Sequence, residues 1–146
     1  MSSASATIND LIEVLEDGTK FYQEALTKVS RPDLRSLFGR MATTKAAIAS
    51  DLKSTVAGHG DKPAQSGSFS GSLRKAYAEA RAKFSSDKDY AYIAELEQFE
   101  DRILHEFREA AQKSDDMSVR TIAQRYLPEI TRDHATMRDL KHSRAA

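Results

Sequence analysis

Acidic and histidine side chains interrupt the apolar stripes of several helical segments in this sequence. Glu100 lies within the stripe of the segment 90–111, Glu97 borders that stripe, and Asp17 and His134 hold middle positions in two other segments. Carboxylate oxygens together with an imidazole suit iron or manganese, and helical bundles build two-metal sites from such inward residues. Asp17, Glu97, Glu100 and His134 are therefore candidate metal ligands, with iron or manganese as the candidate cofactor.

The same residues also have a structural interpretation. Lys45 interrupts the stripe of a fourth segment, and a carboxylate on the core face of a helix is costly to bury without a charge partner or a metal. Glu100 can therefore pair with Lys45 or with His134. On this interpretation Asp17, Lys45, Glu100 and His134 form a polar layer that fixes the register of the helices, and the chain has no catalytic or cofactor-binding residue.

Residue spacing helps to separate the two interpretations. Two-iron sites in bundles use Glu-x-x-His on two helices, whereas the residue three positions before His134 is Thr131. Lys45 stands where that pattern needs a carboxylate, and its charge would compete with a divalent ion. The spacing disfavours an intact two-metal site and leaves open a single or degenerate one. A Lys45 side chain that points inward at Glu100 would argue against a metal there, and one that reaches solvent would leave room for it.

Apolar residues at three- and four-residue spacings predict long amphipathic helices. Four are expected, at about residues 7–29, 32–56, 90–111 and 119–140. Thr7 is the expected N-cap of the first helix, and Pro128 should kink the last one. The pattern predicts an all-α, up-down four-helix bundle.

The middle of the chain predicts a crossover between the second and third helices. Residues 58–71 are rich in Gly and Ser and should form a loop, and a short extra helix is expected at about 73–84. Loop and short helix together are long enough to return the chain along the bundle. We expect one domain over residues 7–142, with residues 1–6 and 143–146 disordered.

Composition excludes several classes of function. The chain of 146 residues has 22 basic and 22 acidic residues, and this balance argues against a nucleic-acid or anionic-membrane partner. There is no cysteine, so disulfides and thiolate chemistry are excluded. No signal peptide is recognisable at the start and no apolar run reaches the roughly 20 residues of a membrane span. We therefore expect a cytoplasmic location.

Several stretches of the chain together resemble a known protein family. They are IxxLIEVLEDGxxFYxxA (8–25), LFxxxxxxK with a following DL pair (37–52), GSLRKAY (71–77), ELEQFEDxxLxxFREA (95–110) and DHxxMRDL (133–140). The chain resembles the bacterial ferritin-like bundle proteins that carry the DUF2383 domain, also called the PA2169 family. The resemblance implies a ferritin-like bundle with a long crossover between its second and third helices.

The resemblance also bears on individual residues and on assembly. The family's recurring polar positions match Asp17, Tyr22, Asp51, Glu97, Glu100, Asp101 and His134. The family usually has Arg where this chain has Lys45 and Gly where it has Phe99. By analogy with ferritin-like bundles, which often pair through their first two helices, a homodimer is expected.

Three hypotheses about function follow, and a non-enzyme is favoured. The leading one is an uncharacterised, non-catalytic or degenerate ferritin-like protein that acts in a stress response through self-association. The rival is a metal-dependent redox or iron-handling protein that uses Glu97, Glu100 and His134. The third is a helical protein–protein interaction module, which would show a large exposed apolar patch.

Overall fold

The described chain is entirely helical, as the apolar spacing predicts. The computed structural model describes residues 2–64, 74–75, 78 and 87–145. Its helices are α1 (Ser3–Lys28), α2 (Pro32–Gly58), α4 (Lys88–Lys113) and α5 (Met117–Ala145), and these ranges contain no strand. The four long helices of the prediction are therefore confirmed. The short extra helix expected near 73–84 lies outside the described residues, except for residues 74–75 and 78.

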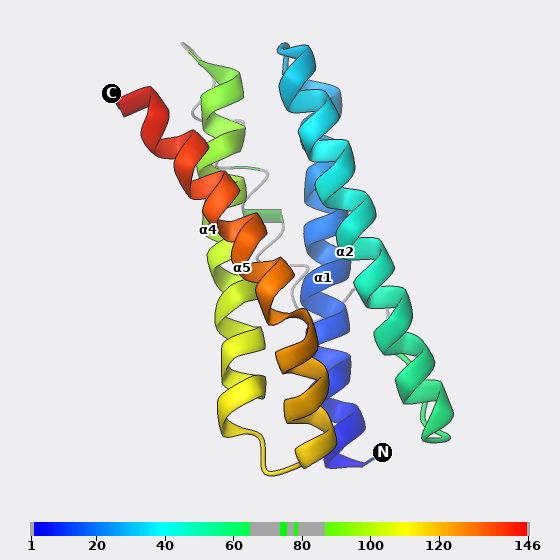
Figure 1. Cartoon of the computed structure of the whole chain (residues 1–146). Helices are drawn as coiled ribbons and strands as arrows, with labels where there is room; N and C mark the ends of the chain where they lie inside the picture. Colours follow the sequence, from blue (N-terminus) through cyan, green and yellow to red (C-terminus); the bar gives the residue numbers. More distant parts are fainter. Residues whose placement is uncertain (1, 65–73, 76–77, 79–86, 146) are drawn as a thin grey trace.

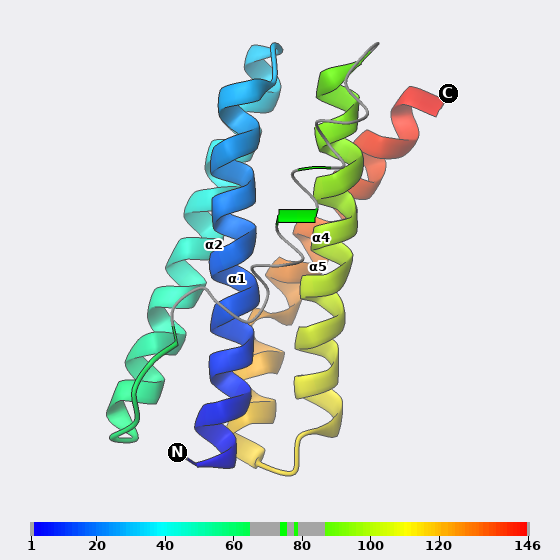
Figure 2. The same ribbon diagram turned by 180° about the vertical axis from the view of Figure 1, so that it is seen from behind.

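The helices form two antiparallel hairpins that face each other (Figures 1 and 2). Backbone contacts are closest between α1 and α2 and between α4 and α5, and α1 joins the hairpins by contacting α4 and, less extensively, α5. Figure 1 shows that α2 ends at the bottom of the bundle and α4 begins at the top. The end of α2 and the start of α4 therefore lie at opposite ends of the bundle, as a crossover connection between them requires.

The helix ends differ from the expected ones. Ser2, not Thr7, caps α1, because its hydroxyl accepts a hydrogen bond from the Ser5 amide at 3.1 Å. Residues 3–6, which we expected to be disordered, form the first turn. Ser5 is fully buried there and its hydroxyl lies 3.3 Å from the His59 ring. At the other end α5 continues to Ala145, past the expected end of the domain at residue 142, since no Gly or Pro follows Leu140 to stop it.

A glycine and a proline lie inside two of the helices, Gly18 in α1 and Pro128 in α5. A Cβ on Gly18 would lie 3.0 Å from Ile103 Cδ1 and 3.5 Å from Lys45 Cδ, so this glycine allows α4 and the Lys45 side chain to approach α1 closely. Pro128 lies inside α5. Figure 1 shows that α5 changes direction in its orange part. Proline removes one helical hydrogen bond and its ring crowds the preceding turn.

Polar contacts fix the α4–α5 hairpin against the turn between α1 and α2. The Asp89 carboxylate, in the first turn of α4, accepts hydrogen bonds from the Ser30 amide (2.8 Å), the Ser30 hydroxyl (2.9 Å) and the Arg31 amide (3.1 Å). Inside the bundle, the Phe21 ring makes edge contacts with Tyr92 and Phe99. These contacts fix how α1 and α4 are aligned along the bundle axis. They therefore also fix which polar groups of the two helices lie at the same level.

The close approach at Gly18 makes a testable prediction. Gly18→Leu should lower the free energy of unfolding by about 1–3 kcal/mol, because the added side chain must displace Ile103 or Lys45. Gly39→Ala is the matched control, since a Cβ at Gly39 meets nothing within 4 Å. It should be neutral or stabilise α2 by up to about 1 kcal/mol. Urea denaturation of both variants measures this, and equal effects would refute the packing role of Gly18.

Candidate functional site: a buried ion-pair centre and a charged seam

One side chain from each helix meets in the interior of the bundle. Lys45 of α2 and Glu100 of α4 are fully buried, and the Lys45 Nζ lies 2.6 Å from Glu100 Oε2. The same Nζ donates a hydrogen bond to Asp133 Oδ2 of α5 at 3.0 Å. Tyr22 of α1 donates its hydroxyl proton to Glu100 Oε2. We call these four residues the buried centre.

The electrostatics of the buried centre keep Lys45 charged. Burial by itself lowers the pKa of Lys45. The carboxylates of Glu100 and Asp133 raise this pKa by more than burial lowers it, so the net shift is upward. The Lys45 Nζ also lies 5.1 Å from the centre of the Tyr22 ring, where the aromatic face attracts a cation. Removing this ammonium from water is therefore compensated by two carboxylates and an aromatic ring.

The acidic partners respond to the same burial. Burial raises the pKa of the Asp133 carboxyl, against the opposing pull of Lys45. Burial and the neighbouring Glu100 carboxylate hold the pKa of Tyr22 well above its usual value, so the phenol keeps its proton and can donate it. The second oxygen of Glu100, Oε1, is buried and accepts no hydrogen bond from the residues that the structure describes. The centre thus has more acceptor capacity than donors.

The structure divides the predicted site residues among three places. It brings Lys45 and Glu100 together, which is one of the two pairings that the sequence leaves open. His134 does not join them: its ring lies between α4 and α5, with Nε2 3.6 Å from Glu97 Oε2 and 3.4 Å from Asp101 Oδ1. Asp17 belongs to neither group, and within the described part of the chain neither of its carboxylate oxygens accepts a hydrogen bond. The four candidate metal ligands therefore do not converge on one point.

Charged residues follow the line where α4 and α5 meet. Glu97 and His134 side chains are each 15% exposed, and Asp101 is 73% exposed. Lys141 donates a hydrogen bond to Glu97 Oε1 at 2.9 Å. We call Glu97, Asp101, His134 and Lys141 the seam cluster. His134, predicted to lie within the apolar stripe, instead lies at the edge of the core, and Glu97, predicted to border the stripe, lies beside it.

Sequence reasoning missed Asp133 and Tyr22 as members of the buried centre. Asp133 lies three residues after Ile130 and four before Met137, which are both fully buried, so its spacing was already that of a core position. Tyr22 lies at a helical spacing in the apolar stripe of α1. The polar tip of a buried tyrosine normally finds a partner, and that rule could have identified Tyr22.

Asp17 is a buried carboxylate without a hydrogen bond among the described residues. It is fully buried, and neither of its oxygens accepts a hydrogen bond from that part of the chain. Burial raises the pKa of Asp17 to about 6, although Lys20 opposes the shift. The neighbouring Glu13 and Glu16 raise it as well. Asp17 is therefore neutral in mild acid and charged at higher pH.

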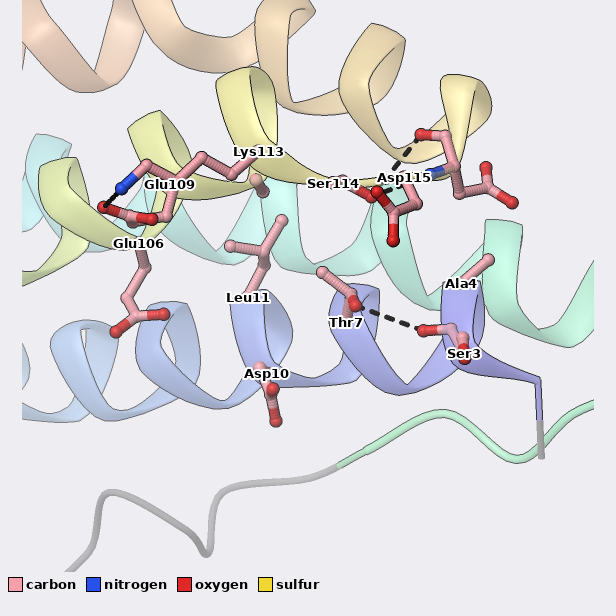
Figure 3. A pocket seen from close by; sticks show the side chains of 12 residues that line it. Ser3, Ala4, Thr7, Asp10, Leu11, Glu106, Glu109, Lys113, Ser114 and Asp115 are labelled. Atoms are coloured by element: carbon pink, nitrogen blue, oxygen red, sulfur yellow. Dashed lines mark hydrogen bonds and ion pairs between the residues drawn. The ribbon is translucent and has the colours of Figure 1, made fainter.

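An open cavity of about 560 Å³ lies between the start of α1 and the turn that joins α4 to α5 (Figure 3). The charged residues of its lining are mainly acidic: Asp10, Glu106, Glu109, Asp115 and Asp116 accompany the cation Lys113. Lys113 is paired with Glu109 at 3.3 Å. None of the residues of the buried centre lines this cavity, and its negative charge is unsuited to phosphate groups.

The fold and the buried centre define an all-α protein whose helices are joined by an internal ion pair. Residues 3–134 match DUF2383, a domain of unknown function, and the chain belongs to this family. No curated protein matches the chain. None of the described helices combines the length and the apolar character needed to cross a membrane.

The ion pair at the buried centre predicts an order of stability among variants. Lys45→Met leaves Glu100 and Asp133 buried without a cation and should lower the free energy of unfolding by about 3–5 kcal/mol. Glu100→Gln should be less harmful, because Lys45 keeps Asp133 as its partner. Lys53→Met is the control: Lys53 pairs with Glu16 at the surface, and its loss should change stability by at most about 1 kcal/mol. Urea unfolding measures the order, which equal losses for Lys45→Met and Lys53→Met would contradict.

The raised pKa of Asp17 predicts that the stability of the protein depends on pH. Its pKa in the folded protein, about 6, is above its ordinary value of 3.8, so the folded state binds a proton that the unfolded state has already lost. The stability from this proton is complete below about pH 4 and is lost as the pH rises through about 6.

Asp17→Asn removes this titration. The free energy of unfolding of the Asp17→Asn variant, relative to that of the wild type, should therefore increase by roughly 1–3 kcal/mol from pH 4 to pH 7. Asp51→Asn, at an exposed position on α2, should show no such trend. Thermal melts at several pH values give the comparison, and parallel curves for wild type and Asp17→Asn would count against a raised pKa.

Proposed function

We propose that this DUF2383 protein is a ferritin-like bundle in which the Lys45 ammonium takes the place of a metal centre, so that the bundle is non-catalytic. The observation that carries the proposal is the position of Lys45 Nζ, 2.6 Å from Glu100 and 3.0 Å from Asp133. An internal cation thus already neutralises the carboxylates that a metal ion would need.

The ferritin-like part of the proposal is supported by topology. The chain forms two antiparallel hairpins, and the second helix of the first hairpin runs in the same direction as the first helix of the second (Figures 1 and 2). Such an order requires one long crossover, which is the connection found in ferritin-like folds. The likeness concerns architecture and carries no activity with it.

The residues of the buried centre do not fit a pair of metal ions. A two-metal site in a bundle needs carboxylates or histidines from all four helices, but α2 contributes Lys45 and α1 contributes Tyr22. Glu100 Oε2 already interacts with both of these residues. A divalent ion at this position would have to displace a buried ammonium, which would then lose both of its carboxylate partners.

A non-catalytic role follows from the burial of these groups. Lys45 and Glu100 are fully buried, and Asp133 is 7% exposed, so no substrate reaches them in this conformation. Function is then carried by the outside of the bundle, as in the hypothesis of self-association during stress. The interaction-module hypothesis has less support, because Met117 is the one large hydrophobic side chain that is exposed among the described residues.

Iron oxidation tests the proposal. Wild-type protein given ferrous iron in air should oxidise it no faster than protein-free buffer, and Glu100→Gln should behave in the same way. Folding of both proteins is checked by circular dichroism. Saturable oxidation with about one or two irons per chain, abolished by Glu100→Gln and retained by His134→Gln, would overturn the proposal and establish a ferritin-like redox centre.

A further inference from the structure

The chain that follows α2 is fastened to the start of α1. We call residues 59–64 the strap, and Figure 3 shows it passing beside the first turns of α1. Three polar side chains of α1 contact it, namely Ser2, Ser5 and Asn9. They are spaced three and four residues apart and hence share one face of the helix. The start of α1 therefore carries a polar stripe that is dedicated to holding the strap.

Asn9 holds the far end of the strap by its backbone. The Asn9 Nδ2 donates a hydrogen bond to the Lys62 carbonyl at 3.2 Å, and its Oδ1 accepts one from the Ala64 amide at 2.7 Å. Asn9 is buried, so breaking these bonds is costly. The Ala64 amide keeps this bond only while the strap is in place, and its hydrogen exchange therefore reports on opening of the strap.

The near end of the strap depends on a single hydroxyl proton. The Ser5 Oγ lies 3.3 Å from His59 Nδ1. Ser5 also donates a hydrogen bond to the Asp61 carboxyl, and this bond is the main reason that the pKa of Asp61 lies below its ordinary value. A hydroxyl has one proton to donate, so both contacts form together only if His59 donates from Nδ1 to Ser5. The neutral imidazole has one proton for its two nitrogens, whereas the protonated ring carries a proton on each.

The groups around His59 favour its protonated form. Asp61 shares the Ser5 hydroxyl with the ring from within the strap, and α1 faces the ring with the uncharged Ser5. Asp116 lies in the turn between α4 and α5. The pKa of Asp116 is lowered mainly by a hydrogen bond from Ser118, and the charge of His59 lowers it further. His59 also caps α2, which has no basic residue in its last turn, and the C-terminal end of a helix attracts a cation.

We propose that the strap is a proton-sensitive latch, in which a proton on His59 completes a hydrogen-bonded chain from His59 through Ser5 to Asp61 and holds the strap against α1. Loss of that proton breaks the chain and leaves the strap held chiefly by Asn9. Ala64 packs against the hydrophobic core, so release of the strap exposes apolar surface on the outside of the bundle. The latch shares no residue with the buried centre, and its failure would leave the proposed function intact.

Hydrogen exchange of the Ala64 amide in the purified full chain tests the latch. A histidine exchanges its proton between about pH 5 and pH 8. Across this range the protection factor, corrected for the intrinsic pH dependence of exchange, should rise about fivefold towards acid, as expected for a cation at a helix C-terminus. His59→Gln should remove this rise. His105→Gln is the matched control: His105 is an exposed histidine on α4, 3.9 Å from Glu109, and its loss should leave the rise unchanged.

Ser5→Ala separates the hydrogen-bonded chain from simple charge attraction. It removes the shared hydroxyl but keeps Asp116 and the end of α2, and it should remove most of the pH dependence at Ala64. Asp61→Asn should act in the same direction and keeps the test valid even if Ser5→Ala folds poorly. The proposal is overturned if the wild-type protection of Ala64 is the same at both ends of the pH range. It is also overturned if Asp61→Asn keeps the full pH dependence, or if His105→Gln removes it.

Discussion

The contact between Lys45 and two carboxylates is the interaction on which the arrangement of the bundle depends. The backbone of α2 packs mainly against α1, yet its Lys45 reaches Glu100 on α4 and Asp133 on α5. A buried ion pair adds little net stability compared with a well-packed apolar core, but a broken one is strongly destabilising. The pair therefore specifies one docking of the two hairpins and penalises every other register that would separate its charges.

The surroundings of Lys45 are shaped to admit it. Gly18 has no side chain where the Lys45 methylenes and Ile103 pass, and Tyr22 presents both its ring and its hydroxyl to the charged groups. The apolar part of the Lys45 side chain thus fills core volume while its ammonium reaches the carboxylates. Packing and electrostatics act at one place here, so they cannot be changed separately by substitution at Gly18 or Lys45.

Much of this could be derived from the sequence, and the remainder depends on angles that a sequence does not define. Apolar spacing predicted the four helices and the inward direction of Glu100. Neighbouring helical residues differ by about 100° around the axis. That rotation separates buried Asp133 from His134 at the seam. The start of α1 was misjudged because Ser5 is buried beside His59, a residue distant in sequence, whose position a local pattern does not define.

The two-hairpin architecture also has a consequence for the order of folding. Within each hairpin the helices are joined by a short turn, so their contacts are close in sequence and form quickly. Docking of the hairpins must close the crossover and strip water from the Lys45 ammonium, which are both slow and unfavourable until the carboxylates are in place. We infer that the hairpins form first and that burial of Lys45 comes late, so that substitutions there act mainly on the rate of unfolding.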